Sequence, residues 1–117
     1  MRLTLPWPPA VLSPNSRAHW RTRHTASASC HELAYYTATM APADHRAHIR
    51  MAKALKLMLT FCPPDKRRRD LDNIELCCKW YIDGIFHACK ADDHIIRMTT
   101  KTWGDVVPRG AVIVEIA

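Results

Sequence analysis

Four stretches of the chain alternate between hydrophobic and polar residues with the two-residue period of a β-strand. The clearest runs from Lys53 to Phe61, where Leu55, Leu57, Leu59 and Phe61 share one face and Lys56, Met58 and Thr60 share the other. Further candidates are Arg2–Leu5, His94–Trp103 and Ala111–Ile116. The first of these should end at "PWPP", because proline cannot donate a hydrogen bond to a neighbouring strand.

Two longer segments have the period of an amphipathic helix. From His24 to Ala41, apolar residues at i, i+3 and i+7 predict one buried face, and Pro42 should end the helix. These apolar residues are Leu33, Tyr36 and Met40. From Asp72 to Ala88, the predicted apolar stripe consists of Ile74, Cys78, Tyr81, Ile82 and Ile85. Residues 6–23 between the first strand and the first helix are predicted to form a loop.

The order strand, helix, strand, helix, strand, strand predicts an α+β fold, a small mixed β-sheet with two main helices packed against it. A chain of 117 residues is expected to form a single domain, 1–117. Its 48% hydrophobic residues and three glycines favour an ordered globular protein. The pattern does not define the order of the strands.

The net charge of +6 is unevenly distributed. Residues 1–60 contain eight Lys and Arg against two acidic residues. Residues 61–117 contain nine of each sign, but their acids gather at Asp70/Asp72 and Asp92/Asp93. A basic chain with two acidic clusters favours a polyanionic ligand that approaches the carboxylates through a divalent metal.

The five cysteines indicate a reducing compartment, because an odd number with two adjacent residues does not suggest a disulfide framework. Zinc bound by Cys77, Cys78, Cys89, His87 and His94 is an alternative. Because the chain has no C-x-x-C pair and adjacent thiols on a helix point about 100° apart, we expect buried cysteines instead. No signal-peptide core or membrane-length apolar run occurs, so we expect a soluble, cytoplasmic protein with no membrane association.

The stretch "RRRDLDN" places three arginines directly before two aspartates. In an extended backbone, Asp70 and Asp72 point the same way and their carboxylates can share one cation. The alternatives are a solvated turn of mutually neutralised charges and, for Asp72, a helix N-cap with Glu75 at N3. Asp92 and Asp93 follow a helix roughly 25 Å long, so they reach the first cluster only if the chain doubles back; otherwise they form an exposed turn.

Five blocks, "LPWPP", "SPNSRAHWR", "PDKRRRDLDN", "ADDHII" and the closing "VIVEI", together resemble the RusA family of Holliday junction resolvases over nearly the full length. The resemblance implies a RusA-like homodimer that cleaves four-way DNA using Mg²⁺, for which Mn²⁺ can substitute, held by aspartates. By motif, Asp70 and Asp72 match the "DLD" pair and Asp93 matches the third metal-binding carboxylate. Asp92 matches a neighbouring acid.

One position departs from the family motif. A lysine is expected four residues after the second aspartate, where this chain has Leu76. Lys79, one helical turn further on, is the candidate replacement and is assigned a catalytic role on that basis. The alternative is an ordinary solvated lysine paired with Asp83.

Two groups of residues are expected to bind DNA. Arg67, Arg68 and Arg69 would hold the phosphates that the aspartates attack through metal. In the predicted loop, Arg17, Trp20, Arg21 and Arg23 would form a basic surface whose aromatic ring stacks at the open junction centre. The alternative for this loop is an ordinary surface segment with Trp20 packed on the core.

The sequence therefore predicts a Mg²⁺-dependent, structure-selective endonuclease that resolves Holliday junctions by paired symmetric nicks. Two such nicks require two active sites, hence a homodimer. The rival is a catalytically weak or inactive protein that binds four-way or branched DNA, which Leu76 favours. A nuclease for other branched or flapped DNA is a third interpretation.

Overall fold

The computed structural model describes all 117 residues and contains one four-stranded mixed sheet and four α-helices, which confirms the α+β class. The strands are β1 (Arg2–Pro6), β2 (Leu55–Cys62), β3 (Ile96–Trp103) and β4 (Ala111–Ile116). The helices are α1 (Trp20–Thr39), α2 (Ala43–Met51), α3 (Leu71–Cys77) and α4 (Lys79–Ala88), with short 3-10 helices η1 (Ala10–Leu12) and η2 (Asp93–Ile95).

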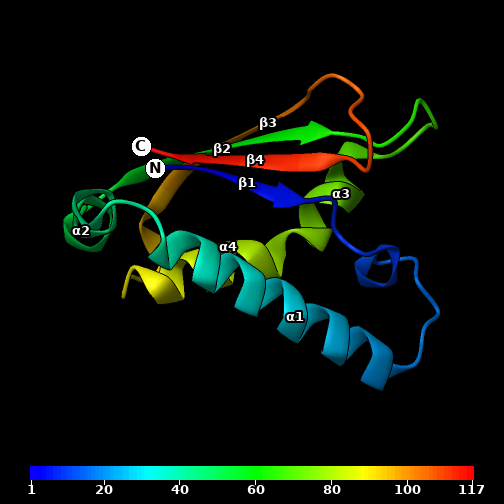
Figure 1. Cartoon of the computed structure of the whole chain (residues 1–117), viewed down its shortest axis with the longest axis horizontal. Helices are drawn as coiled ribbons and strands as arrows, with labels where there is room; N and C mark the ends of the chain where they lie inside the picture. Colours follow the sequence, from blue (N-terminus) through cyan, green and yellow to red (C-terminus); the bar gives the residue numbers. More distant parts are fainter.

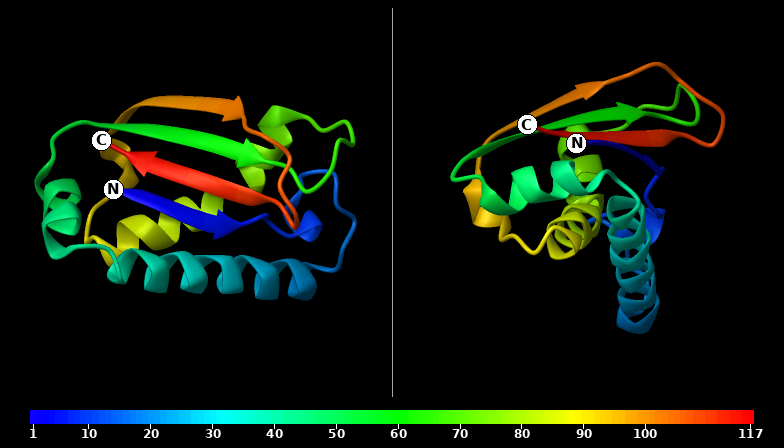
Figure 2. Two further views of the ribbon diagram at one scale, coloured as in Figure 1. Left: turned by 45° about the horizontal axis from the view of Figure 1, so that its top comes forward. Right: turned by 60° about the vertical axis from the view of Figure 1, so that its left-hand side comes forward.

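The strand order is β1-β4-β2-β3. Strand β4 pairs antiparallel with both β1 and β2, whereas β3 pairs parallel with β2 (Figure 2). Although β3 and β4 are consecutive in the chain, β2 lies between them. Strand β3 has β2 as its one neighbour in the sheet and is therefore an edge strand.

The helices cover one face of the sheet and leave the other open (Figure 1). The alternation predicted for β2 is confirmed: Leu55, Leu57, Leu59 and Phe61 are all buried. They join Val112, Val114 and Ile116 of β4 and the inward residues of α4 in a single hydrophobic core. Burial of one face explains why the period-two signal was clear in these strands.

The predicted buried face of α1 is wrong. Leu33, Tyr36 and Met40 are 41%, 57% and 86% exposed. The buried residues of α1 are small instead: Ser27, Cys30, Ala34 and Ala38. The reason is a close approach to α4, where a Cβ on Gly84 would lie 2.3 Å from the carbonyl oxygen of His31.

The N-terminal boundary of α1 and the presence of α2 also differ from prediction. Helix α1 starts at Trp20, because the Nδ1 of His19 accepts a hydrogen bond from the backbone N–H of Arg21 at 3.1 Å. Residues 20–23 are therefore helical rather than part of the preceding loop. Helix α2 was missed because Ile49 is its one buried residue, which leaves no apolar periodicity to detect.

The single helix predicted from Asp72 to Ala88 is interrupted at Cys78, whose backbone (φ −91°, ψ 0°) is a turn conformation. The predicted stripe still faces inward, since Cys78, Tyr81, Ile82 and Ile85 are buried and Ile74 packs at the edge of the core. The break gives α3 a direction of its own, so it contacts β3 while α4 packs on α1 (Figure 1).

All five cysteines are free and buried, which confirms the expectation of apolar core thiols. Burial raises the pKa of Cys30, Cys77, Cys78 and Cys89 above the usual value for a thiol. None of the helices has the length and apolar character needed to cross a bilayer.

Candidate active site

A groove of about 580 Å³ runs beneath the edge strand β3, between that strand and helices α3 and α4. Its apolar lining comes from Leu57, Leu59, Leu76 and Ile82. Its charged lining comprises four carboxylates and two ammonium groups: Asp72, Glu75, Asp83, Asp93, Lys79 and Lys101. In a chain of net charge +6, this is a local concentration of acid.

Three of the predicted catalytic residues line this groove. Asp72 comes from α3, Lys79 from the first turn of α4, and Asp93 from η2, after the chain has turned back beyond α4. Helix α4 has ten residues, about 15 Å, and the groove follows it. The chain therefore turns back along α3 and α4, but Asp72 binds Lys101 near the end of β3 whereas Asp93 precedes the start of that strand, so the two carboxylates lie towards opposite ends of the groove.

Asp70 is not among the residues that line this groove. It is the N-cap of α3, where its Oδ1 accepts a hydrogen bond from the backbone N–H of Asp72 at 3.0 Å. The alternative that made Asp72 the N-cap is therefore wrong by two positions, because the cap is Asp70. Asp72 is 75% exposed in its side chain and free of that task.

Lys101 is a residue of the site that the sequence did not reveal. Its Nζ lies 2.6 Å from Oδ1 of Asp72 and also binds Oε2 of Glu75. These two bonds, with Asp72 the larger influence, raise the pKa of the Lys101 ammonium above its usual value. Lys101 pairs with buried Leu59 across the β2–β3 register, so it points inward at the sheet edge.

The groove contains no ion pair between Lys79 and Asp83, although both line it. Leu76 is 54% exposed beside them. Asp92, next to Asp93, is occupied locally: its Oδ1 accepts from the backbone N–H of His94 at 3.0 Å, which together with the His94 side chain lowers the pKa of Asp92. No group of three or more His, Cys, Asp or Glu side chains is gathered closely enough to hold a metal ion.

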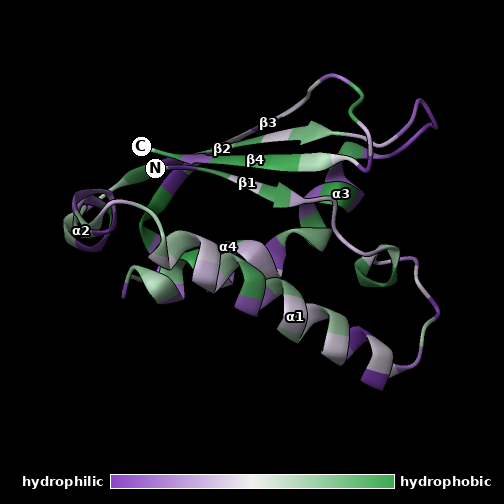
Figure 3. Ribbon diagram, in the orientation of Figure 1, coloured by the Kyte–Doolittle hydropathy of each residue, from purple (hydrophilic) through white to green (hydrophobic).

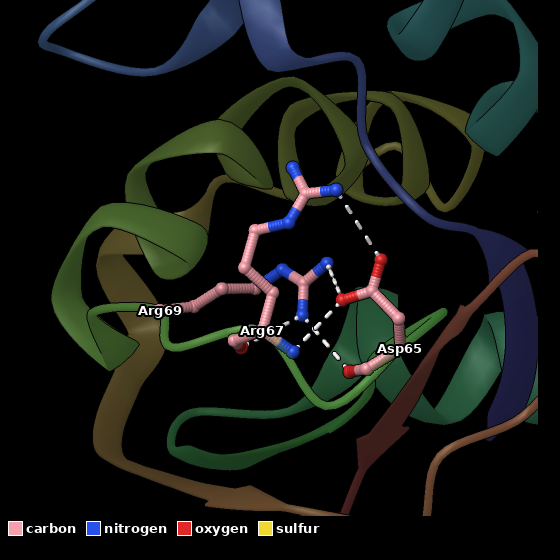
Figure 4. Close-up of polar contacts among 3 residues, drawn as sticks. All are labelled: Asp65, Arg67 and Arg69. Carbon is pink, nitrogen blue, oxygen red and sulfur yellow. Dashed lines mark hydrogen bonds and ion pairs between the residues drawn. The ribbon is translucent and has the colours of Figure 1, made fainter.

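The three arginines of residues 67–69 have different surroundings. Arg69 donates to Oδ1 of Asp65 at 2.8 Å and to two backbone carbonyls, and its guanidinium lies 5.4 Å from the centroid of the Trp7 ring. Arg67 forms a looser ion pair with Asp65 at 3.6 Å (Figure 4). Arg68 is exposed and has no acidic partner. The loop they occupy is strongly hydrophilic (Figure 3).

The residues near the N-terminus that are expected to bind DNA also have different surroundings. Arg23 donates to the carbonyl oxygens of Val11 and Ser13 at 2.7 and 3.0 Å, which ties α1 to the preceding segment. Trp20 is 65% exposed, so it does not pack on the core, and the guanidinium of Arg21 lies 5.3 Å from its ring centroid. Arg17 is exposed in the loop before α1.

Comparison with known proteins gives one informative result. No family model matches the chain. The chain is 33% identical over 114 residues to a protein of Xylella fastidiosa described as "Uncharacterized protein". The alignment covers 97% of this chain and 74% of that protein.

Proposed function

This chain and the Xylella fastidiosa protein belong to one family, and we propose that the chain is a Mg²⁺-dependent endodeoxyribonuclease that resolves Holliday junctions. It would nick two opposed strands of a four-way junction symmetrically, which requires a homodimer with one active site per subunit. We place this activity in the cytoplasm. The RusA-like motif order supplies the reaction class.

The observation that carries the proposal is the shared groove. Asp72 and Asp93 are 21 positions apart in the chain, yet both line one cavity beneath β3. Lys66, Arg67 and Arg68 lie in the loop that leads directly into α3, so cationic side chains adjoin the acidic groove. A DNA phosphate held by such cations would lie close to the carboxylates.

The groove offers the oxygen chemistry of a hard divalent cation, although its carboxylates are not gathered around one point. Carboxylate oxygens are the ligands that Mg²⁺ prefers, and Asp72 and Glu75 already hold a cation, the ammonium of Lys101. The RusA-like motif, rather than the observed geometry, assigns Asp70, Asp72 and Asp93 as the metal ligands, so metal binding would have to draw these side chains together. Bound Mg²⁺ would neutralise charge on the phosphate and activate the attacking water.

The test uses a labelled four-way junction and a matched linear duplex, each incubated with protein in Mg²⁺, in Mn²⁺ or in EDTA. We expect metal-dependent paired nicks in the junction and none in the duplex. Asp72→Asn should abolish the nicks while keeping junction binding, because it removes one metal oxygen and one negative charge near the phosphate. Undiminished cleavage by Asp72→Asn would contradict the proposal.

A second candidate function is junction binding without catalysis, and the position of Lys101 favours it. An ammonium bound to both Asp72 and Glu75 competes with a metal ion for the same oxygens. If it prevents metal binding, Lys101→Met should bind Mn²⁺ at least tenfold more tightly than the wild type by calorimetry. Lys79→Met is the control, since Lys79 lines the groove without a carboxylate partner.

The two candidates then give different results. An active wild-type enzyme should bind Mn²⁺ and cleave, with Lys101→Met changing cleavage as well as binding. A binding protein should show no nicks in either metal, and its junction affinity should be the same in Mg²⁺ and EDTA after correction for ionic strength.

A further inference from the structure

A second hollow, of about 230 Å³, lies where β3 ends and does not belong to the acidic groove. Its lining includes Lys66, Arg67, Arg68, Arg69, Trp103 and Val106. The volume is below the roughly 300–1,000 Å³ of sites that enclose a whole small molecule. A pocket of this size fits part of a larger ligand.

The charge of the pocket indicates an anionic ligand. Four cationic side chains line it against a single carboxylate, Asp65. Asp65 is already committed, because it binds Arg67 through the backbone N–H and Arg69 through the guanidinium, and these bonds lower its pKa. Lys66 and Arg68 are exposed and have no ion-pair partner, so they are free to bind an anion.

Trp103 supplies an aromatic surface in the same pocket. It is the last residue of β3 and is 40% exposed. Its ring contacts that of fully buried Phe61 edge-on, with centroids 6.1 Å apart, and the next residue, Gly104, donates to the Phe61 carbonyl oxygen at 2.8 Å. A Cβ at Gly104 would lie 2.7 Å from Sγ of Cys62, so the chain is held tightly after Trp103. One edge of the indole therefore packs on Phe61, and the backbone after Trp103 is tightly held.

We propose that this pocket binds one unpaired nucleotide of DNA, with the base stacked on the indole of Trp103 and the phosphate held by Lys66 and Arg68. An aromatic ring beside unpaired cations is the arrangement by which proteins hold single-stranded nucleic acid. A fully paired duplex offers no free base face, so the pocket would select DNA with an opened or unpaired segment. The proposal rests on the proposed function for the identity of the ligand, but not on catalysis.

The experiment measures binding in EDTA, so that absence of cleavage does not affect it. Fluorescence anisotropy is recorded with a labelled oligo(dT) strand, a four-way junction and a blunt duplex. Trp103→Ala removes the stacking surface, so this variant should bind oligo(dT) about 5- to 150-fold more weakly than the wild type. Its affinity for the junction should fall less, and its affinity for the duplex should hardly change. Trp103→Phe keeps an aromatic face and should retain most of the affinity.

Tyr36→Ala is the matched control, since Tyr36 is an aromatic residue 57% exposed on α1, outside the pocket. It should leave all three affinities unchanged. Urea unfolding of each variant checks that the fold is kept. Equal losses for oligo(dT) and duplex, or a Trp103→Ala variant that behaves like Tyr36→Ala, would overturn the proposal.

The phosphate contacts have a separate readout. Lys66→Ala and Arg68→Ala should each reduce the slope of log affinity against log salt for oligo(dT) by about 0.7, the value for one phosphate contact on a single strand. Unchanged slopes in both variants would show that neither Lys66 nor Arg68 binds a DNA phosphate.

Discussion

Two aspartates in "PDKRRRDLDN" form local contacts that limit which charged side chains can bind a ligand. Asp65 precedes the arginines and binds two of them, Arg67 and Arg69. Asp70 follows them and caps α3. The sequence suggested that the arginines bind phosphate and the aspartates bind metal. In the structure, however, some of these residues bind one another or cap a helix instead. Arg69, 15% exposed in its side chain, stabilises the loop, whereas Arg68 remains available to a ligand.

The cap at Asp70 leads to a prediction about stability. Asp70→Ala removes the acceptor for the N–H of Asp72, so it should lower the free energy of unfolding by about 1 kcal/mol. Asp70→Asn keeps an oxygen acceptor and should be nearly neutral. Urea denaturation followed by circular dichroism measures both changes. Equal stability of the two variants would show that the capping bond contributes nothing.

The same pair of variants separates capping from metal binding. If Asp70 also supplies a metal oxygen, Asp70→Asn should lose junction cleavage although its stability is unchanged. If Asp70 is only a cap, Asp70→Asn should cleave like the wild type. Asp72→Asn provides the comparison, because Asp72 lines the groove and caps nothing.

At the scale of elements, the strands could be predicted where one face is buried and the other exposed. The predicted bounds of the last strand agree with those of β4, and β2 begins two residues later and ends one residue later than predicted. Strand β3 is more exposed along its length, and its first predicted residues form η2 instead. An edge strand with little burial gives a weak periodic signal.

The predicted buried face of helix α1 was wrong for a different physical reason. Periodicity assumes that the largest apolar residues face the core, but α1 packs so closely on α4 that small residues, such as Ala34 and Ala38, fit there. The site shows a similar limit. Asp72, Lys79 and Asp93 could be found from motif and spacing, whereas Lys101 could not, because its inward orientation depends on a strand register that the sequence does not define.

The close contact of α1 and α4 can be tested by Gly84→Ala. In an isolated helix, alanine is favoured over glycine by about 1 kcal/mol. Here the new Cβ would lie 2.3 Å from the His31 carbonyl oxygen, a backbone atom that cannot move aside alone. We therefore expect a net loss of about 1–3 kcal/mol in the free energy of unfolding. A gain in stability in urea denaturation would show that the helices are further apart.

At the scale of the whole molecule, acidic side chains predominate in one hollow and cationic side chains in another. The acids concentrate in the groove below β3, while Lys66 and Arg68 lie in the loop beyond it. The core between sheet and helices excludes charge and contains thiols and the phenol of Tyr81, whose O–H donates to the carbonyl oxygen of Pro6 at 2.9 Å. This composition makes the core sensitive to alkaline pH.

The pH dependence follows from the raised pKa values of four buried thiols, Cys30, Cys77, Cys78 and Cys89, and of Tyr81. Because these groups lose protons more readily in the unfolded chain, stability should be full below about pH 8.5 and fall as the pH rises towards their folded pKa values. In that range, each thiol should lower the free energy of unfolding by up to about 1.4 kcal/mol for each unit by which the pH rises. Urea midpoints at pH 7, 8, 9 and 10 measure the effect. Cys78→Ala should be less stable than the wild type at pH 7 because the substitution leaves a cavity, but its stability should decline less steeply as the pH rises. A wild-type urea midpoint that stays constant to pH 10 would contradict the raised pKa values of the buried thiols.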